Sequence, residues 1–296
     1  MRDPNETSIT AAVIERVEQA SDPRAREISA ALVRQLHAFI LEVRPSVAEW
    51  EAGIRFLTDV GRMCSETRQE FILLSDTLGV SMLVDSINHP ASDDATETTV
   101  FGPFYVEAPE FANGADISGR LTGTPMYVDG TVRGARNQAL PGAVVDVWHS
   151  DEAGYYDLQT VDVGAGLAGR GRFRTNRDGQ FSFWTVRPAA YPIPDDGPVG
   201  RMLKAQGRHP FRPEHVHFMI QAPGYRKLVT HIFAEGDKYL DSDVVFGVKA
   251  SLIQPCIAHE GGRAPDGRQM TGAWFRLHRD FTLRAEAPTQ RTDVLP

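Results

Sequence analysis

Apolar residues in the first hundred positions recur at the spacing of amphipathic helices. Ile9, Val13 and Val17 are four residues apart. Because residues three or four apart share one face of a helix, this pattern predicts helices with one apolar side. The same pattern occupies residues 26–45, 46–64 and 68–88. We therefore expect four to five helices before residue 100.

From Phe101 onward the apolar runs are short and are separated by glycine and proline. Runs rich in β-branched and aromatic residues, bounded by turn residues, are typical of strands. The clearest ones cover residues 126–134, 142–150, 179–186, 215–223 and 228–236. Many short strands predict a β-sandwich or a barrel. The stretches 109–117 and 191–213 are expected to be long irregular loops, which in a compact domain are usually functional or disordered.

Together these patterns predict an α+β fold. An N-terminal helical domain is expected over residues 1–104, and a mixed β-sandwich domain with long irregular loops over residues 105–296.

Composition and charge narrow the range of partners and compartments. The 296 residues carry a net charge of −8, which argues against nucleic acid as the main partner. Two cysteines are too few for a disulfide framework. The N-terminus lacks the apolar core of a signal peptide, and no run approaches the roughly 18 apolar residues of a membrane helix. We therefore expect a cytoplasmic protein without membrane insertion.

His215 and His217 lie one residue apart in a predicted strand. Side chains at i and i+2 of a strand point to the same face, so both imidazoles should lie together. Neutral imidazole suits zinc, copper, iron and nickel. The alternative is that one histidine is a hydrogen-bonded core residue and the other has no special role. The pair alone favours neither interpretation. The motifs of zinc proteases, zinc ribbons and serine hydrolases are absent.

Tyrosines on two loops add a second kind of metal ligand. Tyr155 and Tyr156 follow the strand that ends at Trp148, and Tyr191 lies on the loop that leads back to the histidine strand. Phenolate is a hard, anionic ligand that suits ferric iron better than Zn²⁺ or Fe²⁺. Two phenolates and one hydroxide would balance three positive charges, which avoids the cost of a net charge in a buried site. Taken alone, each tyrosine is more often a packing residue, and adjacent Tyr155 and Tyr156 could supply at most one ligand.

Four stretches resemble the intradiol ring-cleavage dioxygenases in their order and spacing. They are GPFY at 102–105, DVWHSDEAGYYD at 146–157, residues 171–200 and residues 212–243. The resemblance covers nearly the whole chain. It implies one Fe(III) per chain in the β-sandwich, which is then the catalytic domain, and a helical linker and dimerisation domain before it. It further implies a homodimer built through the N-terminal helices, with a site there that can hold a phospholipid.

Carried over by position, the resemblance assigns roles to individual residues. The implied iron ligands are Tyr156, Tyr191, His215 and His217, with Tyr156 chosen over Tyr155 by its spacing from a glycine. Tyr191 is also the implied base for substrate protons, and Arg212 the group that stabilises negative charge on the ring. His231 stands where many members have glutamine, and this departure leaves the surroundings of the site open. His149, beside Trp148, is expected to be structural.

The same resemblance implies an aromatic diol and O2 as substrates. The positions that match the substrate pocket are Leu73, Asp76, Val100, Phe101, Gly102, Pro103, Phe104, Ile193, Pro194, Arg212 and Val245. Residues 190–220 look most like the members that cleave hydroxyquinol to 3-hydroxymuconate, the tautomer of maleylacetate. Asp76 could accept a hydrogen bond from the third hydroxyl if it faces this pocket. The sequence favours neither this orientation nor the outer face of the helix. Catechol or a substituted catechol is the alternative substrate.

An alternative of another class is a non-catalytic, transthyretin-like binding module. Short strands and the stretch LPGAVVDVW, residues 140–148, also fit such a module. The tyrosines and the histidine pair would then be packing or surface groups.

Overall fold

The computed structural model describes residues 3–65, 68–91, 95–159 and 166–286. It forms two compact units, Met1–Arg62 and Met63–Pro296. In their described parts, no helix is long and apolar enough to cross a membrane.

The first unit consists of α1 (Ile9–Val17), α2 (Pro23–Val43) and α3 (Val47–Met63). The start of α2 is fixed by Asp22, whose carboxylate accepts hydrogen bonds from the backbone N–H groups of Arg24 and Ala25, while Pro23 supplies a preset φ. The helix ends at Arg44, which adopts a left-handed conformation with φ 52° before Pro45. These two caps define the ends of α2, and they agree with the ends of its apolar periodicity in the sequence.

The second unit begins with α4 (Glu70–Thr77) and α5 (Val80–Asn88) and continues into the sheets. The helices predicted for the first hundred residues are therefore confirmed. By compactness α4 and α5 belong with the sheets. The predicted division of roles between residues 1–104 and 105–296 stays a prediction.

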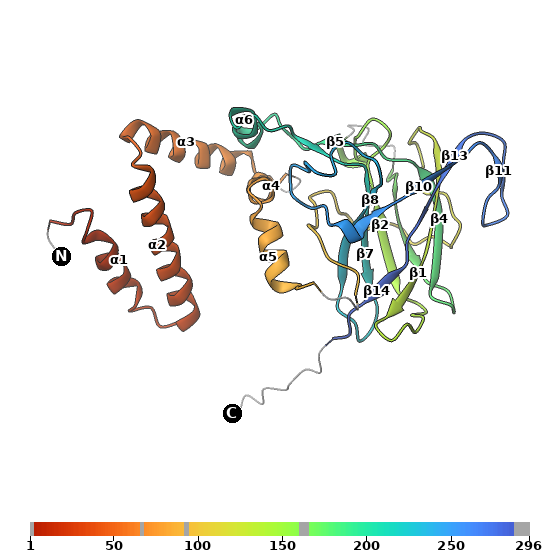
Figure 1. Cartoon of the computed structure of the whole chain (residues 1–296), viewed down its shortest axis with the longest axis horizontal. Helices are drawn as coiled ribbons and strands as arrows, with labels where there is room; N and C mark the ends of the chain where they lie inside the picture. The colour runs from red at the N-terminus through yellow and green to blue at the C-terminus, as the bar shows by residue number, and fades with distance from the viewer. Residues whose placement is uncertain (1–2, 66–67, 92–94, 160–165, 287–296) are drawn as a thin grey trace, which may run out of the picture. The chain divides into compact units, whose positions relative to one another are not determined.

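Two five-stranded sheets form the body of this unit (Figure 1). The first contains β1 (Pro125–Gly134), β4 (Gln180–Val186), β10 (Cys256–His259), β13 (Trp274–His278) and β14 (Phe281–Leu283). The second runs in the order β3 (Arg170–Arg174), β2 (Val144–Trp148), β7 (His215–Gln221), β8 (Leu228–Ala234) and β9 (Ile253–Gln254). Parallel pairs occur in both sheets beside antiparallel ones, so the sheets are mixed, as predicted.

The core joins side chains from both sheets into one apolar cluster. Its large members include Phe173 and Phe218 from the second sheet and Phe183 and Phe281 from the first, all fully buried. A shared core between two sheets defines a sandwich, and the α+β prediction is confirmed. The remaining elements are β5 (Tyr191–Pro192), β6 (Phe211–Arg212), α6 (Pro198–Ala205), β11 (Gly262–Arg263), β12 (Gln269–Met270) and the 3-10 turns Asp157–Gln159 and Ala250–Leu252.

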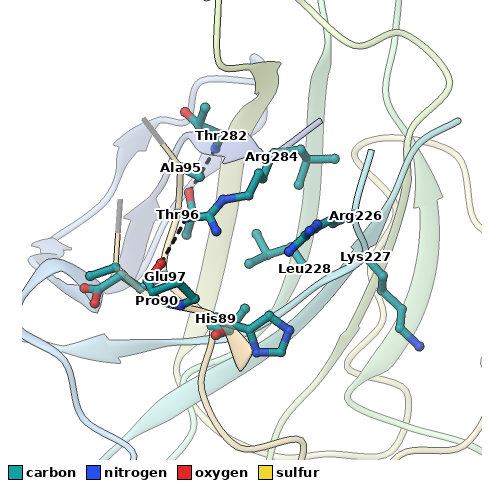
Figure 2. Close-up of a pocket in the computed structure, with 13 residues that line it drawn as sticks. His89, Pro90, Ala95, Thr96, Glu97, Arg226, Lys227, Leu228, Thr282 and Arg284 are labelled. Carbon is teal, nitrogen blue, oxygen red and sulfur yellow. Dashed lines mark hydrogen bonds between the residues drawn. The ribbon is translucent and has the colours of Figure 1, made fainter. Parts of the chain in front are cut away.

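A surface pocket lies where the segment after α5 meets the ends of β8 and β14 (Figure 2). Its walls carry His89, Arg226, Lys227 and Arg284, and Arg284 donates a hydrogen bond to the carbonyl of Pro90 at 3.0 Å. None of the residues predicted to form the iron site or the substrate pocket lines it. The predicted site is instead at the opposite end of β8, beside the start of β7.

Candidate metal centre

The centre of the second sheet positions three aromatic side chains in one row. His217 of β7 lies opposite Trp148 of β2 on one side and opposite His231 of β8 on the other. Trp148 stacks on His217 with ring centroids 4.6 Å apart, and His231 meets it edge-on at 4.0 Å. The imidazole of His217 is thus held on both sides by neighbours that the strand register brings to it.

The strand register of β7 also brings His215 to the same face. The Nε2 atoms of His215 and His217 are 3.1 Å apart, and both side chains are buried. The two histidines therefore converge as the alternation of a strand predicts.

Tyr191 reaches the site through a two-residue ladder inside the long loop 191–213. In this ladder Tyr191 of β5 lies opposite Arg212 of β6, three residues before His215. The rings of Tyr191 and His215 have centroids 5.6 Å apart. The prediction of an irregular loop over 191–213 is therefore wrong in part. The segment contains helix α6 and this local pairing, which fixes a tyrosine and an arginine beside the histidines.

Tyr156 enters from the loop that follows β2. Its backbone N–H donates to the side chain of Gln159 at 2.8 Å, and its hydroxyl lies 2.8 Å from Nε2 of His217. The Tyr156 and Tyr191 rings meet edge to face with centroids 5.3 Å apart. Tyr155 is 54% exposed whereas Tyr156 is fully buried, so only Tyr156 of this pair is at the site.

The hydrogen bonds of the histidines determine which nitrogens carry lone pairs. Nδ1 of His215 lies 2.7 Å from the carbonyl oxygen of Pro213, which can only accept, so Nδ1 carries the proton. Nε2 of a neutral His215 then carries the lone pair, 3.1 Å from Nε2 of His217. Nδ1 of His217 is buried with no partner among the described residues. Lone pairs and phenol oxygens that converge in a buried place are what a metal ion requires, so these residues fit the predicted ion.

Burial sets the protonation of these groups in the absence of a cation. It lowers the pKa of His215 and of His217 well below the usual value, and the nearby Arg212 lowers both further. Burial also raises the pKa of Tyr156 well above 10, and the proximity of Tyr191 raises it further. The imidazoles are therefore neutral at neutral pH, and Tyr156 keeps its proton unless a cation is bound beside it.

Arg212 is a fully buried cation behind the histidines. Its Nε and Nη2 atoms donate to the carboxylate of Asp243 at 3.1 and 3.2 Å, and its Nη1 lies 3.3 Å from Nε2 of His215. Burial alone would lower the pKa of Arg212, but Asp243 raises it above the usual value, so the guanidinium stays charged. Asp243 ends the stretch 212–243 that carries the resemblance, but its pairing with Arg212 was not predicted, because a contact across 31 residues leaves no periodic signal.

His231 forms a third corner of the histidine cluster. Ligand nitrogens of His215, His217 and His231 all lie within 4.8 Å of one another, so these three alone could hold a metal. However, Arg212 can only donate, so Nδ1 of His231, 3.2 Å away, accepts. Burial lowers the pKa of His231, so the ring is neutral, and its single proton is then on Nε2 because Nδ1 accepts. Arg212 also contacts Nε2 of His215, so this contact alone does not separate the histidines. The two tyrosines lie beside His217 and His215, which favours the set of two tyrosines with these two histidines, and His231 contacts Arg212 instead.

Several of the predicted pocket residues surround this cluster. The ring of Phe104 stacks on Tyr156 with centroids 4.4 Å apart, and Gly102 lies against the ring of His217. Asp76 is buried on α4. Burial raises its pKa above the usual value, and a hydrogen bond from Ser81 and the charge of Arg212 offset part of this increase. The sequence did not decide whether Asp76 lies on the buried or the outer face of its helix. In the structure it lies on the buried face, where the charge of Arg212 acts on it.

The other pocket positions differ in exposure. Leu73, Val100, Ile193 and Val245 are buried, Phe101 and Pro103 are exposed, and Pro194 is intermediate. The backbone N–H of Val245 donates to Asp243 at 3.4 Å, which ties Val245 to the partner of Arg212. That all of these residues face one substrate stays a prediction.

His149 is structural in the way the sequence predicts. Both of its ring nitrogens have partners at 2.6 Å, the carbonyl of Ser150 and the hydroxyl of Thr185. Burial lowers the pKa of His149 to about 4. It is therefore a neutral, fully hydrogen-bonded residue of the sheet.

Comparisons with known proteins agree with this geometry. Residues 100–276 match the family described as Dioxygenase, and residues 22–96 match the one described as Catechol dioxygenase N terminus. The chain belongs to the intradiol ring-cleavage dioxygenase family. It is therefore placed among ring-cleaving enzymes, and the alternative of a non-catalytic binding module is not supported.

Within this family the chain is similar to proteins named for hydroxyquinol. It is 48% identical to hydroxyquinol 1,2-dioxygenase of Nocardioides simplex, over 94% of this chain and 95% of that protein. The crystal structure of hydroxyquinol 1,2-dioxygenase from Pseudomonas putida DLL-E4 has a TM-score of 0.88 and 47% identity, over 95% of this chain and 99% of that chain. Catechol 1,2-dioxygenase of Acinetobacter radioresistens is more distant, with a TM-score of 0.81 and 27% identity, over 97% of this chain and 95% of that chain.

Gly102 offers a test of how closely the histidines are packed. A Cβ atom added there would lie 2.9 Å from Cε1 of His217, and Gly102 also has φ +77°. Gly102→Ala should therefore displace His217 and lower metal affinity roughly 10–100-fold, the usual effect of disturbing a ligand's support. The measurement is competition with a chelator for the bound metal.

Gly114→Ala is the matched control, because Gly114 has φ +82° but open space around its Cβ position. Both variants carry the same backbone strain, so the difference between them isolates the contact with His217. Equal metal affinity of the two variants would contradict the proposed role of this contact.

Proposed function

We propose that this protein is an Fe(III)-dependent intradiol dioxygenase that cleaves hydroxyquinol with O2. The observation that carries the proposal is the convergence of two buried phenols and two neutral imidazoles at the start of β7. Similarity to the hydroxyquinol 1,2-dioxygenases supports the choice of substrate. Catechol or a substituted catechol is the alternative. The low cysteine count, two in 296 residues, supports the proposed cytoplasmic location.

The proposed iron ligands are Tyr156, Tyr191, His215 and His217, with one iron per chain. Two phenolates and a hydroxide would offset the three charges of ferric iron, which suits a place where a net charge would be costly. When bound, ferric iron would act as a Lewis acid that draws electron density from an aromatic diol and so favours attack by O2 on the ring.

Two protein groups carry the proton and charge chemistry in this proposal. Tyr191, as a phenolate, takes a proton from the diol as the diol binds, and acts as the general base. Arg212 stabilises the negative charge that develops on the ring, which is possible because its own charge is secured by Asp243. Support from Asp243 and His231 fixes the direction of the guanidinium before the substrate arrives.

The reaction inserts both atoms of O2 into the ring. The bond between two adjacent hydroxylated carbons breaks, each of these carbons becomes a carboxyl carbon, and dioxygen is the oxidant. Hydroxyquinol then gives 3-hydroxy-cis,cis-muconate, which tautomerises to maleylacetate without further reactants. No nicotinamide or flavin is required for this balance.

Iron content and colour test the proposal directly. The purified protein should be red to purple and contain about one ferric iron per chain, since tyrosinate bound to Fe(III) absorbs visible light. Tyr156→Phe should shift or bleach the visible band, because it removes a phenolate. The control is Tyr155→Phe, which alters the exposed neighbour and should leave the band unchanged. Stoichiometric zinc without a visible band would reject the assignment.

Substrate preference tests the proposed role of Asp76. A buried acceptor that pairs a substrate hydroxyl is left unpaired when that hydroxyl is missing, at a cost of roughly 1–3 kcal/mol. The wild type should therefore prefer hydroxyquinol over catechol by about tenfold to a hundredfold in kcat/KM. Asp76→Ala should reduce this ratio more than it lowers catechol turnover, whereas Arg212→Ala should damage both reactions. Equal or better use of catechol by the wild type would reject hydroxyquinol and leave the ring-cleavage chemistry intact.

We further propose a homodimer through the N-terminal helices, together with a bound phospholipid in that region. The helices α2 and α3 each carry an apolar stripe at helical spacing that is about half exposed in the single chain. On α2 it comprises Ile28, Leu32, Leu36, Phe39 and Val43, and on α3 Val47, Trp50, Ile54 and Leu57. Exposed apolar surface of this continuity is costly in water, and a two-fold partner would bury the same stripe on both chains.

Phe39→Glu should break the dimer, because it places a charge in the middle of the α2 stripe, where Phe39 is 54% exposed. Arg34→Gln is the control: it changes the net charge by the same amount on the opposite side of the helix. Sedimentation should give a dimer for the wild type and Arg34→Gln, and a monomer for Phe39→Glu. A monomeric wild type at micromolar concentration would contradict the dimer, and solvent extraction followed by mass spectrometry would detect the lipid.

A further inference from the structure

One buried ion pair outside the proposed ligand set reaches both sides of Tyr156. Arg170 of β3 and Asp157 have side chains that are each 1% exposed. Nε of Arg170 donates to Oδ2 of Asp157 at 2.8 Å, and Nη2 donates to Oδ1. Two parallel hydrogen bonds of this kind fix both the distance and the orientation of the two groups.

The carboxylate of Asp157 organises the chain around Tyr156, which directly precedes it. It accepts hydrogen bonds from the backbone N–H of Leu158 at 2.9 Å and from that of Ala168 at 3.1 Å. The turn that carries Tyr156 is thereby tied to the start of β3.

The third arm of the guanidinium contacts the other side of Tyr156. Nη1 of Arg170 donates to the carbonyl oxygen of Phe104 at 2.9 Å. The ring of Phe104 stacks on the ring of Tyr156 at 4.4 Å with an interplanar angle of 20°. One cation therefore holds the backbone that carries Tyr156 and the residue that packs on its ring.

The backbone of Arg170 is itself fixed to the histidine row. Arg170 pairs with Trp148 across β3 and β2, and Trp148 stacks on His217. A chain of direct contacts thus leads from the strand that carries His217 to the loop that carries Tyr156. The hydroxyl of Tyr156 and Nε2 of His217 are the two atoms that this chain keeps 2.8 Å apart.

We propose that Arg170 and Asp157 are positioning residues that set where the Tyr156 phenol meets His217. The pair touches neither the substrate nor the iron, and it acts through Tyr156 and Phe104. The inference rests on the proposed function only for its visible readout, since the contacts themselves are those of the protein. Loss of supporting residues typically costs 10–100-fold in metal affinity or activity.

Arg172 provides a matched control on the same strand. It also makes a two-point pair, with Nε and Nη2 donating to Asp146 at 2.7 and 3.1 Å. Its other ion pair is with Glu107. Arg172→Gln therefore removes a similar pair from the same strand without touching Asp157 or Phe104.

The test compares full-length Arg170→Gln with Arg172→Gln in two measurements. Hydrogen exchange of the metal-free proteins should be faster for Arg170→Gln in peptides covering 101–106 and 154–159. For Arg172→Gln it should be unchanged in the peptide covering 154–159, which is the one compared, because Arg172 also contacts Tyr105. In the iron-loaded proteins, Arg170→Gln should shift the visible band and release iron to a chelator at least tenfold faster. Equal exchange, band position and iron release in the two variants would overturn the proposal.

A single substitution leaves a buried charge unpaired, so two further variants accompany it. Arg170→Lys keeps the charge but cannot bridge Asp157 and Phe104, and Asp157→Asn with Arg170→Gln removes both charges. Both should reproduce the faster exchange near Tyr156. Failure of all three variants to fold would assign the pair to stability alone and overturn the proposal. A wild type without a visible band would reject the iron assignment instead, while the exchange experiment would still decide the role of the pair.

Discussion

The burial of three imidazoles beside a guanidinium is the constraint on which the rest of the site depends. None of these histidines takes up a second proton there at neutral pH, since burial and the charge of Arg212 both lower the pKa values of His215, His217 and His231. Neutral imidazoles each keep one lone pair, and the neighbouring acceptors and donors decide which nitrogen holds it. The backbone carbonyl of Pro213 places the proton of His215 on Nδ1, and Arg212 places the lone pair of His231 on Nδ1. The lone pairs that this cluster could offer to a metal ion follow from desolvation together with these two partners.

The strand register of the sandwich keeps the histidines together. Strand β7 is paired on both sides, so a shift of one residue would turn both histidines toward the opposite face. The apolar core formed by residues such as Phe173, Phe218 and Phe281 prevents that shift, because the alternate positions of the strand are buried in it. Core packing far from the chemistry thereby fixes which residues meet at the site.

The sequence predicted the elements better than their connections. Periodicity was sufficient for the helices and for the strands that carry His215 and Trp148, because each pattern is local. The two-residue ladder of Tyr191 with Arg212 was not predicted, since such short pairing leaves no periodic signal. The partners Asp243 and Asp157 were missed for a related reason: a buried acid is recognised by what it contacts across the fold. Asp76 shows the same limit, as an acid in an apolar helix whose orientation only tertiary packing decides.

Two buried carboxyl groups interact with Arg212 in different ways. Asp243 contacts the guanidinium directly and receives two of its hydrogen bonds, so this pair is internally satisfied. Asp76 interacts with Arg212 through its charge and not through a hydrogen bond. Burial raises the pKa of Asp76, and a hydrogen bond from Ser81 offsets part of this increase. A carboxyl group in that condition gains more from a further hydrogen-bond partner than one already paired. Arg212 thus needs Asp243 to remain charged in its buried place, and the weaker support of the Asp76 carboxyl group is consistent with the substrate contact proposed for it.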